Sequence, residues 1–213
     1  MNIKVPARLV QTYKESFLDE VYYKGLPGNL MGNTPVIIDI GANVGYFSLF
    51  SLMRFPKAKL LAFEPMPMNF RLLEKYCREH KEYDFTPVNK AVSGEKGHIT
   101  LQYDASDSFT TSATIFDTSH GSDTLQVETT TLANIIATYN LDRINLLKLD
   151  CEGSEYSILY GADDDVWAKI KALSIETHKG SGEKQNTEDL VVYLRQKGYT
   201  TKSEGDIVWA FRQ

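Results

Sequence analysis

The sequence has few cysteines, no long hydrophobic run and no excess of basic residues, and each absence argues against a class of protein. It holds 2 cysteines in 213 residues, which argues against a disulfide scaffold and favours a reducing compartment. No apolar run approaches the ~20 residues of a membrane span, and the N-terminus has no signal-peptide core. The net charge of −5 gives no reason to expect nucleic acid or an anionic membrane as a partner. We therefore expect a cytoplasmic protein.

What the sequence does contain is the pattern of an α/β protein. Hydrophobic residues make up 42% of the chain and charged residues 24%, as in soluble globular proteins. Apolar runs of strand length alternate with stretches of helical period, which predicts a parallel sheet flanked by helices. We expect an N-terminal helical extension over residues 1–34, an α/β domain over residues 35–213, and within it an inserted β-hairpin and loop over residues 94–131.

Residues 36–48 have the pattern strand, glycine turn, helix, which opens a nucleotide-binding α/β unit. The strand ends near Asp39, Gly41 and Gly45 bracket the turn, and Asn43 is the expected N-cap of the helix. Glycine lets the backbone approach a ligand closely, and the first amides of a helix have no partner within it. An ordinary turn between strand and helix is the alternative interpretation.

This turn lacks the glycines that a dinucleotide requires. In the pattern G-x-G-x-x-G, Asn43 replaces the second glycine and Tyr46 replaces the third. The Asn43 side chain would crowd a pyrophosphate, and Asp39 suits a ligand that carries an ammonium group. S-adenosylmethionine (SAM) has an ammonium group and no phosphate, so these residues favour SAM over a dinucleotide.

Two further loops are expected to contact the nucleoside. Glu64 follows the strand predicted over residues 59–63, where α/β nucleotide-binding folds place a carboxylate against the ribose hydroxyls. Asn89 and Ala91 follow the strand predicted over residues 85–88 and would lie near the adenine. The alternatives are a surface glutamate before a loop and an ordinary turn.

The N-terminal segment and the insertion are the parts that open and interrupt the α/β pattern. Residues 6–24 have the period of one helix, which we expect to pack across the sheet, with a lid over the site as the alternative. The polar stretch over residues 104–124 is expected to be a loop, either solvated or serving as a flap over the substrate. Strands are also expected over residues 144–149 and 170–175, and a closing hairpin over residues 199–211.

Acidic side chains gather where several predicted strands end. Ligands of open α/β sheets bind at the carboxyl ends of the strands, so Asp150 and Glu176 should share one rim with Asp39 and Glu64. Asp150 is also expected to bind the cofactor, near the methionine end of SAM and the acceptor. Carboxylates in one cleft repel each other unless a cation, a raised pKa or hydrogen-bond donors offset the charge. Lys148 precedes Asp150 on the same face of its strand and could pair with an acid.

The same cluster suggests acid–base chemistry. The catalytic candidates are Asp150, Glu152, Glu176, His178 and Lys148. A histidine with an ordinary pKa can deprotonate a hydroxyl near neutral pH, which is the role considered for His178. The alternative is a divalent metal held by the three acids and His178, and metal-free catalysis is the favoured interpretation. Glu155 is interpreted as a charge at a helix N-terminus.

Taken together, these motifs resemble the FkbM-type SAM-dependent methyltransferases. The matching segments are residues 39–48, 63–65, 89–91, 147–155 with 161–162, and 175–178. The resemblance implies a Rossmann-like seven-stranded sheet with one antiparallel strand, SAM as cofactor and, usually, a hydroxyl acceptor. Cys151 and Ala133 depart from the family pattern, which often has an aliphatic residue and an aspartate at these positions.

The leading hypothesis is therefore a methyltransferase that acts on a hydroxyl of a small molecule or a sugar. A non-catalytic SAM-binding or partner-binding module would keep the glycine turn and Glu64 but would not need the acidic rim. A dinucleotide-dependent oxidoreductase is opposed by the missing glycines. Specificity for the acceptor is expected to lie in residues 1–34, in the polar insertion and in residues 179–186.

Overall fold

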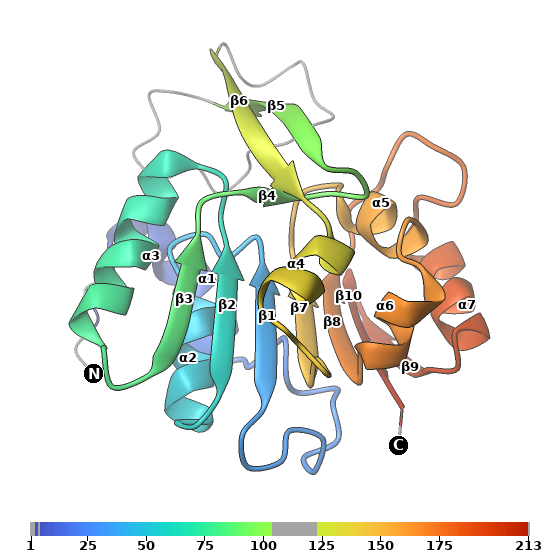
Figure 1. The fold of residues 1–213 in the computed structure, drawn as a ribbon, viewed down its shortest axis with the longest axis horizontal. Coiled ribbons are helices and arrows are strands. Elements are labelled where there is room, and N and C mark those ends of the chain that lie inside the picture. The colour runs from blue at the N-terminus through green and yellow to red at the C-terminus, as the bar shows by residue number, and fades with distance from the viewer. Residues whose placement is uncertain (1–2, 4, 104–122, 213) are drawn as a thin grey trace.

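A seven-stranded sheet forms the centre of this computed structural model, which describes residues 3, 5–103 and 123–212 (Figure 1). The strand order is β3-β2-β1-β7-β8-β10-β9. The strands are β1 Val36–Ile40, β2 Lys59–Phe63, β3 Asp84–Val88, β7 Leu146–Leu149, β8 Ala172–Glu176, β9 Thr200–Glu204 and β10 Ile207–Phe211. β10 is antiparallel to both of its neighbours, whereas the other paired strands run parallel. The predicted α/β sheet with one antiparallel strand is confirmed.

Helices cover both faces of this sheet, which explains why its inner strands are continuous apolar runs. Successive residues of a strand point to opposite faces, so Ile37 of β1 joins one core cluster and Ile38 joins the other. The first cluster packs against α1 Val10–Phe17, α2 Tyr46–Arg54 and α3 Pro67–Glu79. The second packs against α4 Leu132–Thr138, α5 Glu155–Tyr160, α6 Asp164–Lys169 and α7 Thr187–Gln196. α6 is too short to show a helical period, but the Asp163 side chain caps it at Val166 N with a bond of 2.8 Å.

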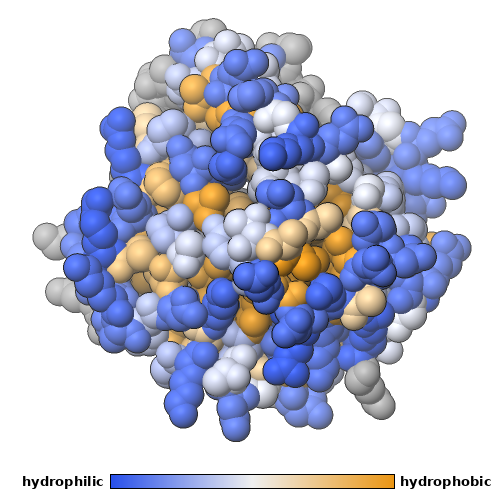
Figure 2. Space-filling view, viewed as in Figure 1, coloured by the Kyte–Doolittle hydropathy of each residue, from blue (hydrophilic) through white to orange (hydrophobic). Residues whose placement is uncertain are grey.

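Hydrophilic side chains dominate the periphery of the face seen in Figure 2, and apolar residues appear near its middle. None of the helices in the described part of the chain combines the length and the apolar character that crossing a bilayer requires.

The N-terminal segment differs from the single helix predicted over residues 6–24. A short 3-10 turn, η1 Ala7–Leu9, leads into α1, and α1 ends at Phe17. Glu20 then has a left-handed backbone, with φ of 45°, which turns the chain out of the helical path. The following turn buries Tyr22 and Tyr23 and is joined to β10 by a hydrogen bond of 2.9 Å from Trp209 Nε1 to Val21 O. Burial of these rings against the sheet outweighs the local helical preference.

A second, three-stranded sheet interrupts the main fold. It consists of β4 Ala91–Val92, β6 Asp123–Thr130 and β5 Gly97–Tyr103, in that spatial order. β5 and β6 pair antiparallel, as expected of the predicted hairpin. Most of the loop expected over residues 104–124 lies outside the described residues. In Figure 1 this small sheet stands above the carboxyl ends of β1, β2 and β3, so the insertion forms a roof over that edge.

Candidate active site

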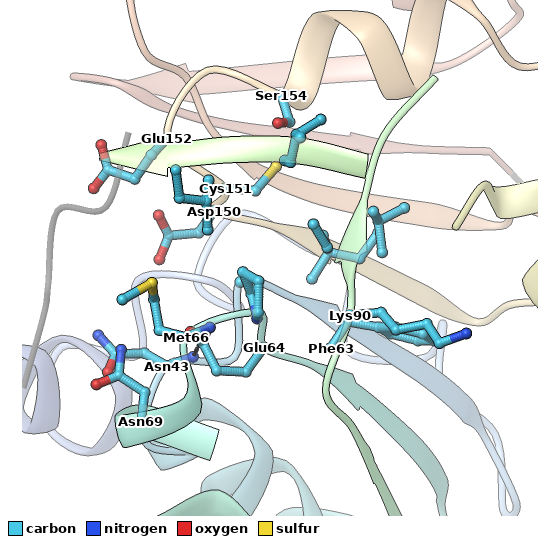
Figure 3. Close-up of a pocket in the computed structure, with 17 residues that line it drawn as sticks. Asn43, Phe63, Glu64, Met66, Asn69, Lys90, Asp150, Cys151, Glu152 and Ser154 are labelled. Atoms are coloured by element: carbon cyan, nitrogen blue, oxygen red, sulfur yellow. Dashed lines mark hydrogen bonds between the residues drawn. The ribbon is translucent and has the colours of Figure 1, made fainter. Parts of the chain in front are cut away.

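A pocket lies between the carboxyl ends of the central strands and the inserted sheet (Figure 3). It is partly open to solvent. Figure 3 shows Asp150 and Glu152 on one side of it and Asn43 and Asn69 on another. The lining residues are Ile40, Gly41, Asn43, Phe63, Glu64, Pro65, Met66, Asn69, Lys90, Ala91, Val92, Ile99, Leu101, Asp150, Cys151, Glu152 and Ser154.

Glycine is required at the first turn because the chain passes very close to β7 there. Gly41 has φ of 73°, and a Cβ added to it would lie 1.7 Å from the carbonyl oxygen of Asp150. Gly45, with φ of 92°, is the N-cap residue of α2, and an added Cβ would lie 2.6 Å from Leu73 Cδ1. The prediction of Asn43 as the N-cap is therefore wrong, and Gly45 serves the packing of the turn against α3. Of the two glycines, Gly41 lines the pocket.

Glu64 lines the pocket and accepts hydrogen bonds from two backbone amides there. Its Oε2 accepts a hydrogen bond of 2.8 Å from Asn43 N, and its Oε1 accepts one of 2.9 Å from Met66 N. Burial raises the pKa of this carboxyl to about 7, although the bonds from Met66, Asn43 and the Asn69 side chain lower it. Glu64 thus ties the glycine turn to the start of α3, and Asn69 is a pocket residue that the sequence motifs did not indicate.

The loop after β3 contributes to the pocket through one of its two predicted residues. Ala91 lines the pocket, as does its neighbour Lys90. Asn89 lies outside the lining, and its Nδ2 donates to Glu64 O at 2.8 Å and to Pro65 O at 3.0 Å. The structure therefore makes Asn89 a brace for the loop that carries Glu64.

Asp39 and Lys148 form an ion pair inside the sheet. They are paired in the register of β1 and β7, and Asp39 Oδ1 lies 3.2 Å from Lys148 Nζ. The Asp39 side chain is fully buried, and Ser48 Oγ donates to its other oxygen at 2.6 Å. The expected contact between Asp39 and a ligand ammonium group is therefore replaced by a contact with Lys148.

Lys148 contacts both the buried Asp39 and Asp150, which lines the pocket. Its Nζ donates to Gly41 O at 2.8 Å and to Asp150 Oδ2 at 3.3 Å. Burial alone would lower the pKa of Lys148, but the carboxylates of Asp39 and Asp150 raise it above its ordinary value. The ammonium group is thus charged at neutral pH and cannot act as a base. It offsets part of the charge of the acidic cluster, as predicted.

Asp150 and Glu176 meet at a tyrosine that the sequence motifs did not indicate. Tyr22 Oη lies 3.1 Å from Asp150 Oδ2 and 2.8 Å from Glu176 Oε2. The Tyr22 side chain comes from the N-terminal segment, 128 residues before Asp150, so no local pattern links the two. Burial, followed by the charge of Asp150, raises the pKa of Glu176.

His178 lies between two glutamates. Its Nδ1 is 2.9 Å from Glu155 Oε1, and its Nε2 is 3.5 Å from Glu152 Oε2. Burial acts to lower the pKa of His178, but the hydrogen bond and charge of Glu155 raise it to about 9. An imidazolium is a poor base at neutral pH, so the ordinary pKa expected for His178 is wrong in this environment.

Glu155 is more than a charge at the start of α5. It is fully buried, and besides His178 it accepts hydrogen bonds from Cys151 N at 3.1 Å and Gly153 N at 3.0 Å. Glu152, in contrast, lines the pocket, and burial raises its pKa to about 7 despite the charge of His178. The imidazolium thus joins a buried acid to an acid at the pocket wall.

The alternative of a metal ion has a geometric basis. Asp150, Glu176 and His178 each offer an oxygen or nitrogen atom, and these atoms lie within 4.8 Å of one another. The described residues already supply two offsets to the acidic charge, the Lys148 ammonium and the His178 imidazolium. These two cations offset part of the acidic charge, and metal-free catalysis stays a prediction.

The raised pKa values predict that the ligand-free protein loses stability as the pH rises. Glu64 and Glu152 bind protons up to about pH 7 when folded, against 4.5 ordinarily, so stability falls across that interval. His178 binds its proton up to about pH 9, against 6.5, so the stability it contributes is complete below 6.5 and is lost through 9. We expect the melting temperature to fall as the pH rises from 4.5 to about 9. Glu64→Gln should flatten the lower half of the curve and His178→Asn the upper half, and a melting temperature that rose with pH would contradict the shifts.

Comparison with known proteins agrees with this architecture. Residues 39–201 match the family described as Methyltransferase FkbM domain. The chain is 31% identical to Methyltransferase sdnD of Sordaria araneosa, over 92% of this chain and 83% of that protein. It is 28% identical to the 31-O-demethyl-FK506 methyltransferase FkbM of Streptomyces tacrolimicus, over 93% of this chain and 84% of that protein.

A solved structure shares the fold. The crystal structure of methyltransferase FkbM from Methylobacillus flagellatus KT matches with a TM-score of 0.63 at 17% identity. The match covers 94% of this chain and 48% of that one, so this chain spans about half of the crystallised protein. The family match and the Sordaria relative both cover most of the present sequence. The chain therefore belongs to the FkbM methyltransferase family, whose cofactor is S-adenosylmethionine.

Proposed function

We propose that this methyltransferase transfers the methyl group of SAM to a hydroxyl of a small molecule or sugar, with Asp150 accepting the hydroxyl proton. The observation that carries the proposal is the place of the Asp150 carboxylate, which lines the pocket at the end of β7 and is 27% exposed. SAM supplies an electrophilic methyl group on a sulfonium. The protein must then bind the acceptor hydroxyl and remove its proton.

The pocket fits the cofactor in three respects. Asn43 Oδ1 is buried and has no hydrogen-bond partner among the described residues, so it can accept a bond from a polar ligand. Gly41 lines the same space, and without a side chain its backbone can lie against a ligand. Glu64 lines the same space with a buried carboxyl that can accept hydrogen bonds from ribose hydroxyls. We infer that these three residues, with Ala91, hold the nucleoside.

Asp150 is held for a role as base by two neighbours. Lys148 Nζ and Tyr22 Oη both contact Oδ2, at 3.3 Å and 3.1 Å. Within the described part of the chain, Oδ1 is the carboxylate oxygen left for an acceptor hydroxyl. A positioned carboxylate that removes a proton during transfer makes the oxygen a better nucleophile.

The walls around Asp150 suit an acceptor with both polar and apolar parts. Glu152 lines the pocket and is joined to His178, so an acceptor meets a charged side there. Ile99 and Leu101 of β5 line it from the inserted sheet and present an apolar side. The Streptomyces relative is named for an O-demethyl substrate, which supports an oxygen as the atom methylated.

Screening hydroxylated small molecules and sugars with SAM tests this proposal. We expect a mass gain of one methyl group in an acceptor, and fragmentation should place it on oxygen. A product methylated on nitrogen or carbon would contradict the hydroxyl acceptor. Tight SAM binding without any product across the whole panel would favour the non-catalytic module.

A further inference from the structure

The N-terminal segment contributes a hydroxyl to the catalytic rim. Tyr22 is 5% exposed, and its Oη contacts one carboxylate at the end of β7 and another at the end of β8. The residue lies outside the segment that matches the family, which begins at residue 39. Its place is fixed, because the adjacent Val21 accepts a bond from Trp209 Nε1 and an added Cβ on Gly25 would lie 2.1 Å from the Trp209 ring.

The two acids share one phenolic hydrogen. Tyr22 Oη is the donor in both contacts, at 2.8 Å to Glu176 Oε2 and at 3.1 Å to Asp150 Oδ2. Burial and the charge of Asp150 raise the pKa of Glu176, and the hydrogen bond from Tyr22 acts to lower it. Asp150 also contacts the Lys148 ammonium. The Tyr22 hydroxyl thus offsets part of the repulsion between the two carboxylates.

We propose that Tyr22 is a positioning residue whose hydroxyl joins Glu176 to Asp150 and holds the Asp150 carboxylate at the pocket wall. This inference rests on the proposed role of Asp150 as the base. Without the hydroxyl, Glu176 loses a hydrogen bond that lowers its pKa, so it keeps its proton to higher pH. Asp150 Oδ2 loses one of its two donors at the same time.

Tyr22→Phe tests the hydroxyl alone, because the ring can keep its packing. The ring lies 5.3 Å from Phe47, edge to face, and 5.0 Å from Lys148 Nζ. Tyr23→Phe is the matched control. Tyr23 is the next residue, it is buried to a similar degree, and its hydroxyl donates to Ser51 Oγ at 2.8 Å, away from the acids. The two variants lose the same group in the same turn.

Two kinetic measurements are expected to distinguish Tyr22→Phe from Tyr23→Phe. At neutral pH, Tyr22→Phe should lower kcat by about tenfold or more with little change in KM for SAM, whereas Tyr23→Phe should match the wild type. The acidic limb of the pH–rate profile should move to higher pH in Tyr22→Phe, so raising the pH restores part of the activity. The pair also faces titratable groups that both variants keep, namely Asp39, Lys148, Glu152, Glu155 and His178.

A third readout does not depend on turnover. Carboxyl ¹³C NMR, with signals assigned through Asp150→Asn and Glu176→Gln, should show the proton of the pair leaving at higher pH in Tyr22→Phe than in the wild type. The shift should disappear in a Glu176→Gln background, because the carboxyl that titrates is then absent. An unchanged titration, or equal losses in Tyr22→Phe and Tyr23→Phe at every pH, would overturn the inference. If Asp150→Asn retained full turnover, the proposed function would fail instead, whatever the NMR result.

Discussion

Replacing Asp150 by alanine is expected to abolish methyl transfer while SAM affinity stays measurable. Removal of a positioned base typically lowers turnover by about a hundredfold to ten-thousandfold. Asp150 lines one side of the pocket, and Glu64 and Asn43 line the opposite side (Figure 3). The loss should therefore appear in kcat, measured at saturating SAM and acceptor, with calorimetry reporting SAM binding separately.

The Asp150→Ala substitution also removes one partner of the Lys148 ammonium. Lys148 would keep Asp39 at 3.2 Å, so the buried charge remains paired and the protein should still fold. Asp150→Asn, which keeps the shape but not the charge, should be similarly inactive. Asp164→Asn is a suitable control, because Asp164 is an exposed acid paired with Lys197 on the surface. Loss of SAM binding with unchanged turnover at saturation would contradict the role assigned to Asp150.

Glu64→Ala is expected to weaken SAM binding by about tenfold to a hundredfold, the effect of losing a hydrogen bond to a charged or strongly polar acceptor. Part of the effect is direct, through the hydrogen bonds that Glu64 is proposed to accept from the ribose hydroxyls. Part is indirect, because the amides of Asn43 and Met66 lose their acceptor and the glycine turn is released from α3. Calorimetric titration with SAM measures the sum.

Glu64→Gln separates the two parts. The glutamine retains one carbonyl oxygen, so it can hold one of the two amides but cannot accept from both amides and the ribose. We expect an affinity between those of the wild type and the alanine variant. An unchanged affinity in Glu64→Ala would remove this residue from the ribose site and leave it a purely structural brace.

The prediction of the main sheet succeeded because its signals are local. β1, β2, β7 and β8 are apolar runs bounded by glycine, proline or acidic residues, and their pattern follows directly from burial on both faces. The positions of Asp150 and Glu176 at strand ends also follow, because parallel strands end at the same edge of a sheet. Their convergence is thus a consequence of topology that the sequence alone allows one to infer.

The interaction partners of these residues could not be predicted from local sequence patterns. Asp39 and Lys148 look like separate polar residues in two strands, and only their register makes them an ion pair. The expected helix over residues 6–24 ends at Phe17, before the left-handed Glu20. Beyond it, Val21 is hydrogen-bonded to Trp209 of β10, 188 residues away, and Tyr23 stacks on Phe47 of α2. Helical period reports which residues are apolar, but it does not report what they meet.

By itself, the sequence of this protein determined the α/β sheet, the glycine turn, the acidic rim and the family. Those features depend on burial period, on backbone geometry at glycine and on residues adjacent in the chain. Tertiary structure alone decided the protonation of the rim, because charge and burial depend on neighbours brought together from distant segments. It placed Tyr22 between Asp150 and Glu176 and set His178 between two glutamates, which turned an expected base into a cation.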